Sequence, residues 1–80
     1  MNGQMALKMD DMMRGVLDVF VSTDGYATTG YLVDELDSTR PTVTKRLDRL
    51  HAAEYIEYVH EPTAFWRLND DPREEGDDDG

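Results

Sequence analysis

The stretch of sequence from residue 39 to residue 51 reads TRPTVTKRLDRLH, and it decides the fold that we expect. Its long apolar side chains recur at the spacing of an α-helix, and they are Val43, Leu47 and Leu50. Pro41 falls in the first turn, where a residue without an N–H does no harm. At about 100° per residue, Lys45 and Arg49 lie opposite the apolar side chains. The pattern predicts an amphipathic helix from about Arg40 to Ala53.

The same stretch is positively charged within an acidic chain. Its four basic side chains outweigh one acid, Asp48, and give a local charge of +3, whereas the 80-residue chain carries −10 and the remainder therefore −13. A cationic helix face in an acidic protein indicates a site for an anion, and nucleic acid is the anion that this pattern favours.

On the N-terminal side of this stretch, the apolar residues from Met5 to Phe20 follow helical spacing and predict a first helix over residues 6–22. Gly15 inside it costs about 1 kcal/mol relative to Ala, so it indicates either a close approach by a neighbouring element or a tolerated weakness. The apolar residues of this helix exceed what one small core can bury. The Met-rich first helix is therefore also predicted to form the interface of a homodimer.

A second helix is expected between these two. A short extended piece around Tyr26 and Ala27 precedes Thr28, which is a good N-cap for a helix that runs through Leu36. Residues 37–39 then form a three-residue connector to the basic helix.

Beyond the basic helix the pattern changes to an alternation of period two. The segments 55–60 and 65–68 flank a Pro-Thr interruption and predict a two-stranded hairpin. Trp66 and Leu68 share the face expected to pack on the helices, while Arg67 points the other way.

The chain divides into one domain with two tails. Residues 1–5 are expected to be disordered, residues 6–69 to form the domain, and residues 70–80 to form a disordered acidic tail. The tail holds seven acidic side chains and one basic side chain, a composition that cannot build a core.

Residues 28–47 read TTGYLVDELDSTRPTVTKRL. This phrase resembles the turn and recognition helix of small prokaryotic transcription regulators of the MarR and ArsR type, which are winged helix-turn-helix domains, and the likeness extends from about Leu7 to Leu68. The resemblance implies an α+β fold in which the third helix enters the major groove of DNA, the second helix braces it, and the hairpin is the wing. Where the family commonly has Gly after the third helix, this chain has Ala53 and Glu54. Either a non-Gly residue takes the left-handed cap, or the helix ends differently.

Candidate DNA-binding side chains come from the third helix, the start of the second helix and the wing. They are Arg40, Pro41, Thr42, Thr44, Lys45 and Arg49, then Thr28 and Thr29, then Thr63 and Arg67. The long cations can reach guanine edges or phosphate oxygens, and threonine offers a hydroxyl together with a methyl suited to thymine. For Thr28 and Thr29, phosphate binding at a helix N-terminus and simple capping explain the residues equally well. Arg46 lies nearer the core and is expected to pair with an acid such as Glu35 or Asp34.

The inventory of reactive side chains argues against catalysis. There is no cysteine for a disulfide, a thiol nucleophile or a Cys-type zinc site, and the two histidines do not make a convincing metal site. Gly-rich phosphate loops and Ser/His/Asp patterns are missing, so we expect no enzyme, no cofactor and no small-molecule substrate. No apolar run approaches the roughly 20 residues that cross a bilayer, and we expect a cytoplasmic protein.

Two functions compete. The first is a sequence-specific regulator of transcription that binds double-stranded DNA, and the alternative is a winged-helix interaction module within a larger transcription or replication assembly. The spread of acids along the chain, with two Lys beside six Arg, resembles the proteins of extreme halophiles, although an ordinary acidic protein with a charged tail shares that composition.

Overall fold

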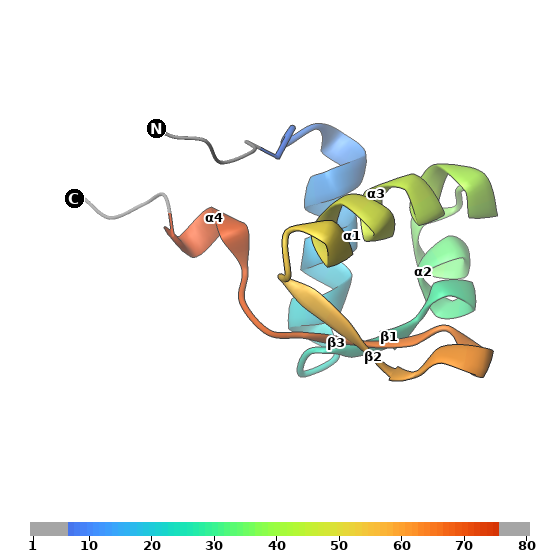
Figure 1. Ribbon diagram of the computed structural model, residues 1–80. Coiled ribbons are helices and arrows are strands. Elements are labelled where there is room, and N and C mark those ends of the chain that lie inside the picture. Colours follow the sequence, from blue (N-terminus) through green and yellow to red (C-terminus); the bar gives the residue numbers. More distant parts are fainter. Residues whose placement is uncertain (1–6, 76–80) are drawn as a thin grey trace.

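The computed structural model describes residues 7–75 of the chain. They form a small α+β domain in which three helices pack on one side of a three-stranded antiparallel sheet (Figure 1). The elements in chain order are α1 (Asp11–Ser22), β1 (Tyr26–Thr28), α2 (Thr29–Leu36), α3 (Arg40–Ala52), β2 (Ile56–His60), the 3-10 helix η1 (Glu61–Thr63), β3 (Phe65–Leu68) and a short α4 (Pro72–Glu75). Residues 1–5, which the sequence predicts to be disordered, lie outside the described part.

The core lies between the three helices and the inner face of the sheet. Its largest fully buried side chains are Phe20, Met13, Leu17, Leu32, Leu47, Leu50, Ile56, Val16 and Val43. They include the apolar residues predicted to face inward from the basic helix. A Cβ built on Gly15 would lie 2.9 Å from Cδ2 of Leu36, so this glycine permits a close approach of α2 to α1. Of the two explanations offered by the sequence, close approach is therefore the right one.

α1 starts later than the apolar spacing predicts, at Asp11 and not at residue 6. The carboxylate of Asp10 accepts a hydrogen bond from the backbone N–H of Met13 at 2.8 Å and so caps the first turn. Leu7 and Met9 precede the cap but still pack against the core. An extended segment can bury apolar side chains too, which is why the spacing alone placed the start wrongly.

α1 leaves less apolar surface than the prediction of a homodimer assumed. Met9, Met12 and Val19 are partly buried against the core, whereas Val21 is 57% exposed and is the exposed large hydrophobic of this helix. Most of the apolar residues that looked surplus in the sequence are thus accommodated within one chain.

A short turn connects α2 to α3 and sets their relative orientation. Thr28 caps α2 by accepting a hydrogen bond from the N–H of Tyr31 at 3.0 Å, as the sequence predicts. Asp37 takes a left-handed conformation (φ 51°) that ends α2, and Thr39 caps α3. Caps of this kind contribute about 1 kcal/mol each.

A residue other than glycine makes the left-handed turn after α3. The helix ends at Ala52, and Glu54 has φ 69°. The first of the two alternatives for this junction is confirmed, and the chain turns into β2 from there.

The sheet has one more strand than the predicted hairpin, because the extended piece at Tyr26–Thr28 pairs with β3. The strand order is β1-β3-β2, and Trp66 of β3 faces Ala27 on one side and Tyr58 on the other. Trp66 is 3% exposed, and its indole N–H donates to the hydroxyl of Thr29 at 2.9 Å. The prediction that Trp66 packs on the helices is confirmed.

The structure differs from the predicted disorder after residue 69. Residues 70–75 are described, and they include α4. The side chain of Asp71 is 8% exposed and accepts hydrogen bonds from Nε and Nη2 of Arg73, which also reaches Asp18 of α1 at 2.7 Å. Ion pairs hold this segment although it has no apolar residue. A prediction of disorder from low hydropathy does not take such ion pairs into account. Residues 76–80 lie outside the described part.

Candidate nucleic-acid interface

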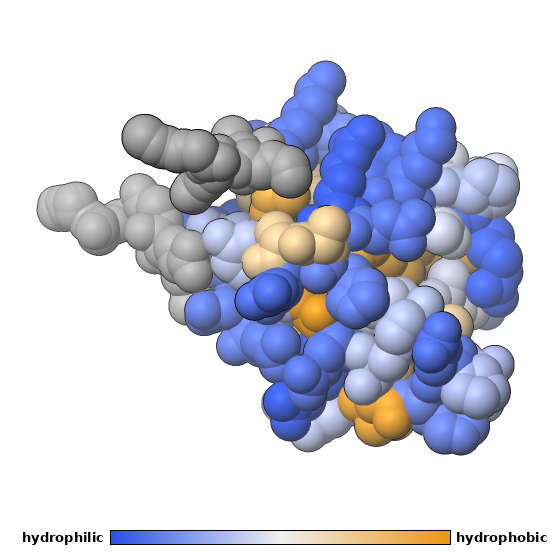
Figure 2. All heavy atoms as spheres, viewed as in Figure 1, coloured by the Kyte–Doolittle hydropathy of each residue, from blue (hydrophilic) through white to orange (hydrophobic). Residues whose placement is uncertain are grey.

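The outer face of α3 carries exposed cations without internal partners. Arg40, Lys45 and Arg49 are exposed, and none of them makes an ion pair with an acid in the described part of the chain. Figure 2 shows that hydrophilic side chains cover most of the surface over this helix. These charges are thus available to an external anion.

Arg46 is the basic residue of α3 that is already engaged. Its Nη2 donates to Asp10 at 2.7 Å, and its Nη1 donates to the carbonyl of Thr42 at 3.4 Å. The acid is at the N-cap of α1 and not on α2, so the predicted pairing with Glu35 or Asp34 was wrong. The hydrogen bond from Arg46, and then that from the Met13 N–H, lower the pKa of Asp10 below its ordinary value. The pair fastens α3 to the beginning of α1.

The side chain of Arg40, at the start of α3, reaches the first turn of α2. A Cβ built on Gly30 would lie 3.7 Å from Nη2 of Arg40, so the guanidinium passes beside α2. Pro41 is exposed, while Thr42 and Thr44 are half-buried. The hydroxyl of Thr39 donates to that of Thr42 at 2.9 Å, which orients Thr42.

Thr29 is not at the surface. It is 4% exposed, and its hydroxyl accepts the hydrogen bond from Trp66. The candidate role of Thr29 in binding phosphate is therefore incorrect. Thr28 is half-buried and acts as the cap of α2, which is the alternative that the sequence left open.

The two wing candidates lie in different surroundings. Thr63 is exposed at the tip, in η1, where its hydroxyl hydrogen bonds with His60. Arg67 pairs with Glu57 and also donates to Asn69. Because Trp66 faces the helices, the neighbouring Arg67 lies on the opposite face of the sheet. The structure therefore does not bring Arg67 together with the cations of α3.

An aromatic cluster that sequence reasoning missed joins α3 to the wing. The rings of Tyr58 and Trp66 stack with centroids 3.9 Å apart, and His51 meets both edge-on at 5.4 and 5.3 Å. The alternating pattern did place Tyr58 and Trp66 in facing strands. Their contact also depends on the strand register, which has a bulge between Tyr58 and His60, and no sequence signal specifies that bulge.

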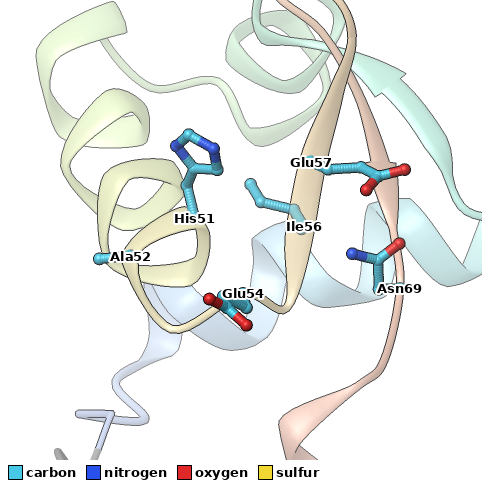
Figure 3. Close-up of a pocket in the computed structure, with 6 residues that line it drawn as sticks. All are labelled: His51, Ala52, Glu54, Ile56, Glu57 and Asn69. Atoms are coloured by element: carbon cyan, nitrogen blue, oxygen red, sulfur yellow. The ribbon is translucent and has the colours of Figure 1, made fainter.

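A surface hollow of about 360 Å³ lies between the end of α3, β2 and the residue after β3. It is lined by His51, Ala52, Glu54, Ile56, Glu57 and Asn69 (Figure 3). Two carboxylates and no Lys or Arg line it, so it does not suit an anion. Among residues 7–75 no three His, Asp or Glu side chains gather as a metal site would require. No helix in that range is long and apolar enough to cross a membrane.

The family, curated-protein and solved-structure comparisons found no match to this chain.

Proposed function

We propose that this protein binds double-stranded DNA in a sequence-specific manner and regulates transcription by occupying its site. In this proposal the domain is a winged helix-turn-helix, α3 is the recognition helix in the major groove, and β2, η1 and β3 form the wing. An α-helix fits the width of the major groove, where base edges are distinguishable.

The observation that carries the proposal is the state of the cations on α3. Lys45 and Arg49 are exposed on a helix whose other face is fully buried, and no acid of the described chain neutralises them. A chain of net charge −10 has many acids that could pair with them. An unpaired cationic ridge on a rigid helix suits an external polyanion.

The test measures binding of a labelled duplex, selected from a random pool, by fluorescence anisotropy over a series of salt concentrations. Lys45→Ala and Arg49→Ala should each weaken binding about 5- to 100-fold, and loss of a phosphate contact should reduce the salt slope by about one. Arg14→Ala is the matched control because Arg14 is exposed on α1 and pairs with Asp11. It should change affinity by less than about twofold. Equal losses in all three variants, or no binding from low to molar salt, would contradict the proposal.

A protein partner is the second candidate, and the acids around the cationic face favour it. Asp48 and Glu61 are exposed on α3 and η1, and they would oppose close approach to phosphates. A labelled polyglutamate peptide serves as the probe. Binding of this peptide that depends on Lys45, with no binding of any selected duplex, would make the domain an interaction module.

Within the DNA-binding proposal, a two-fold homodimer would set two α3 helices about 34 Å apart on one face of the duplex. Sedimentation of the protein with and without its duplex measures that stoichiometry. Regulation of a prokaryotic promoter would place the protein in the cytoplasm.

A further inference from the structure

We infer that Asp48 is a specificity-determining residue that accepts a hydrogen bond from the N4 amino group of cytosine in the major groove. The inference rests on the proposed function, and it assigns one base to one side chain. Asp48 is absent from the set of contacts expected from the sequence, which named basic residues, threonines and Pro41.

The position of Asp48 on α3 is the first support. At about 100° per residue, it lies about 60° from Lys45 around the helix axis, and Arg49 lies about 40° from Lys45 on the other side. Val43 and Leu47 lie on the far side of the helix and are buried. Asp48 therefore belongs to the outward face, between the cations and the flank beside the wing.

His51 shows which flank of α3 faces the wing. It lies one turn after Asp48, and its ring contacts Tyr58 and Trp66 of the wing. One exposed acid of the wing, Glu61, is on η1, whereas Glu57 pairs with Arg67 on the face of the sheet turned away from the helices. Of the three unpaired cations of α3, Lys45 and Arg49 lie away from this flank, whereas Arg40 at the start of the helix lies on it. A DNA backbone would run along the Arg49 side, leaving Asp48 over the base edges.

The chemistry of the groove then selects the base. Asp48 is exposed and makes no ion pair or hydrogen bond with the described chain, although Lys45 and Arg49 are close in sequence. A carboxylate only accepts hydrogen bonds, and phosphate oxygens repel it. Amino groups are the donors of the major-groove base edges, and the N4 of cytosine is the characteristic partner of Asp and Glu.

The experiment selects binding sites from a random duplex pool with three proteins: the wild type, Asp48→Asn and Asp48→Ala. The wild type should select cytosine at one position and discriminate against the other bases there about tenfold or more. Asn pairs with adenine, so Asp48→Asn should shift that position toward adenine, whereas Asp48→Ala should leave it without preference. Both variants should bind non-specific duplex about two- to fivefold more tightly, since one like charge is removed.

The matched control is Asp24→Asn, which removes the same charge from the exposed turn between α1 and β1. Its selected sites should equal those of the wild type. If the Asp48 variants select unchanged sites, or gain only non-specific affinity, Asp48 does not contact a base and the inference is overturned. If the wild type selects no site at all, the proposed function itself fails, so the two failures are distinguishable.

Discussion

Arg46 and Asp10 lie far apart in the sequence, yet their 2.7 Å contact joins the recognition-helix candidate to the cap of α1. Both side chains are largely screened from water, at 18% and 27% exposure. The Nε of Arg46 is buried without a hydrogen-bond partner in the described chain, so this guanidinium depends on its carboxylate. This pair therefore joins α3 to α1 in addition to the buried apolar side chains of α3, which are Val43, Leu47 and Leu50.

Asp10→Asn tests that pair, because Asn keeps the cap and removes the charge. The folded-state pKa of Asp10 is lowered, so its charge stabilises the fold above its ordinary pKa of 3.8. That stability disappears as the pH falls through the lowered pKa. The free energy of urea unfolding at pH 7 should be lower in Asp10→Asn, and the difference from wild type should shrink below about pH 4. Asp24→Asn, at an exposed acid without an ion pair, should show neither effect; a constant difference at all pH values would refute the ion-pair explanation.

At the scale of elements, α4 shows how a segment without apolar residues can be attached. Arg73 bridges the buried Asp71 and Asp18 of α1, and its hydrogen bonds lower the pKa of Asp71. The same bonds raise the pKa of Arg73, so the bridge is fully charged near neutral pH. The ion pair between Arg73 and Asp18 therefore holds α4 against α1.

Arg73→Ala should lower the free energy of unfolding by about 1–3 kcal/mol, because it removes the guanidinium donors of the buried Asp71 carboxylate and leaves it only the backbone N–H of residue 73. Arg14→Ala removes an equally charged residue whose pair with Asp11 is solvent-exposed, and should cost less than about 1 kcal/mol. Urea unfolding measures both values. Equal losses in the two variants would show that α4 is not held by its ion pairs.

At the scale of the whole molecule, like charges dominate. The 80-residue chain carries a net charge of −10, and residues 7–75 hold fifteen acids against eight bases. The described ion pairs use several acids, but Asp24, Asp34 and Glu35 are exposed without one. Salt shortens the screening length from about 10 Å at 0.1 M to about 3 Å at 1 M, which removes most repulsion between exposed charges.

The melting temperature should therefore rise with KCl, by about 4–8 °C for each kcal/mol of repulsion that is screened. A variant with Asp24→Asn, Asp34→Asn and Glu35→Gln should start from a higher melting temperature and gain less from salt. Thermal unfolding followed by circular dichroism in 0.1 and 2 M KCl measures both. A melting temperature that is flat or falls with salt would rule out self-repulsion as a limit on stability.

Several features could be predicted because they depend on neighbours in the sequence. The period of Val43, Leu47 and Leu50 specifies a buried helix face, and Thr28 caps its own helix. Lys45 and Arg49 are exposed for the same reason, since a helix that buries one face presents the other to water. The α+β class and the exposed cationic face follow from these local rules.

Other features needed the folded chain. Thr29 is buried because β3 brings the indole of Trp66 to its hydroxyl, and Arg67 is turned away because Trp66 faces the core. The ion-pair partner of Arg46 also depends on the fold. The sequence allowed several acids as partners, and the packing of α1 beside α3 brings Asp10 to Arg46.

The sequence by itself determined that α1, α2 and α3 form, which faces of them are buried and the charge of α3, because hydrophobic period and capping act over a few residues. Only the tertiary structure decided which cations remain unpaired, which candidate threonine is buried, and that residues 70–75 are ordered. Those outcomes depend on contacts between distant residues, whose geometry follows from packing and strand register.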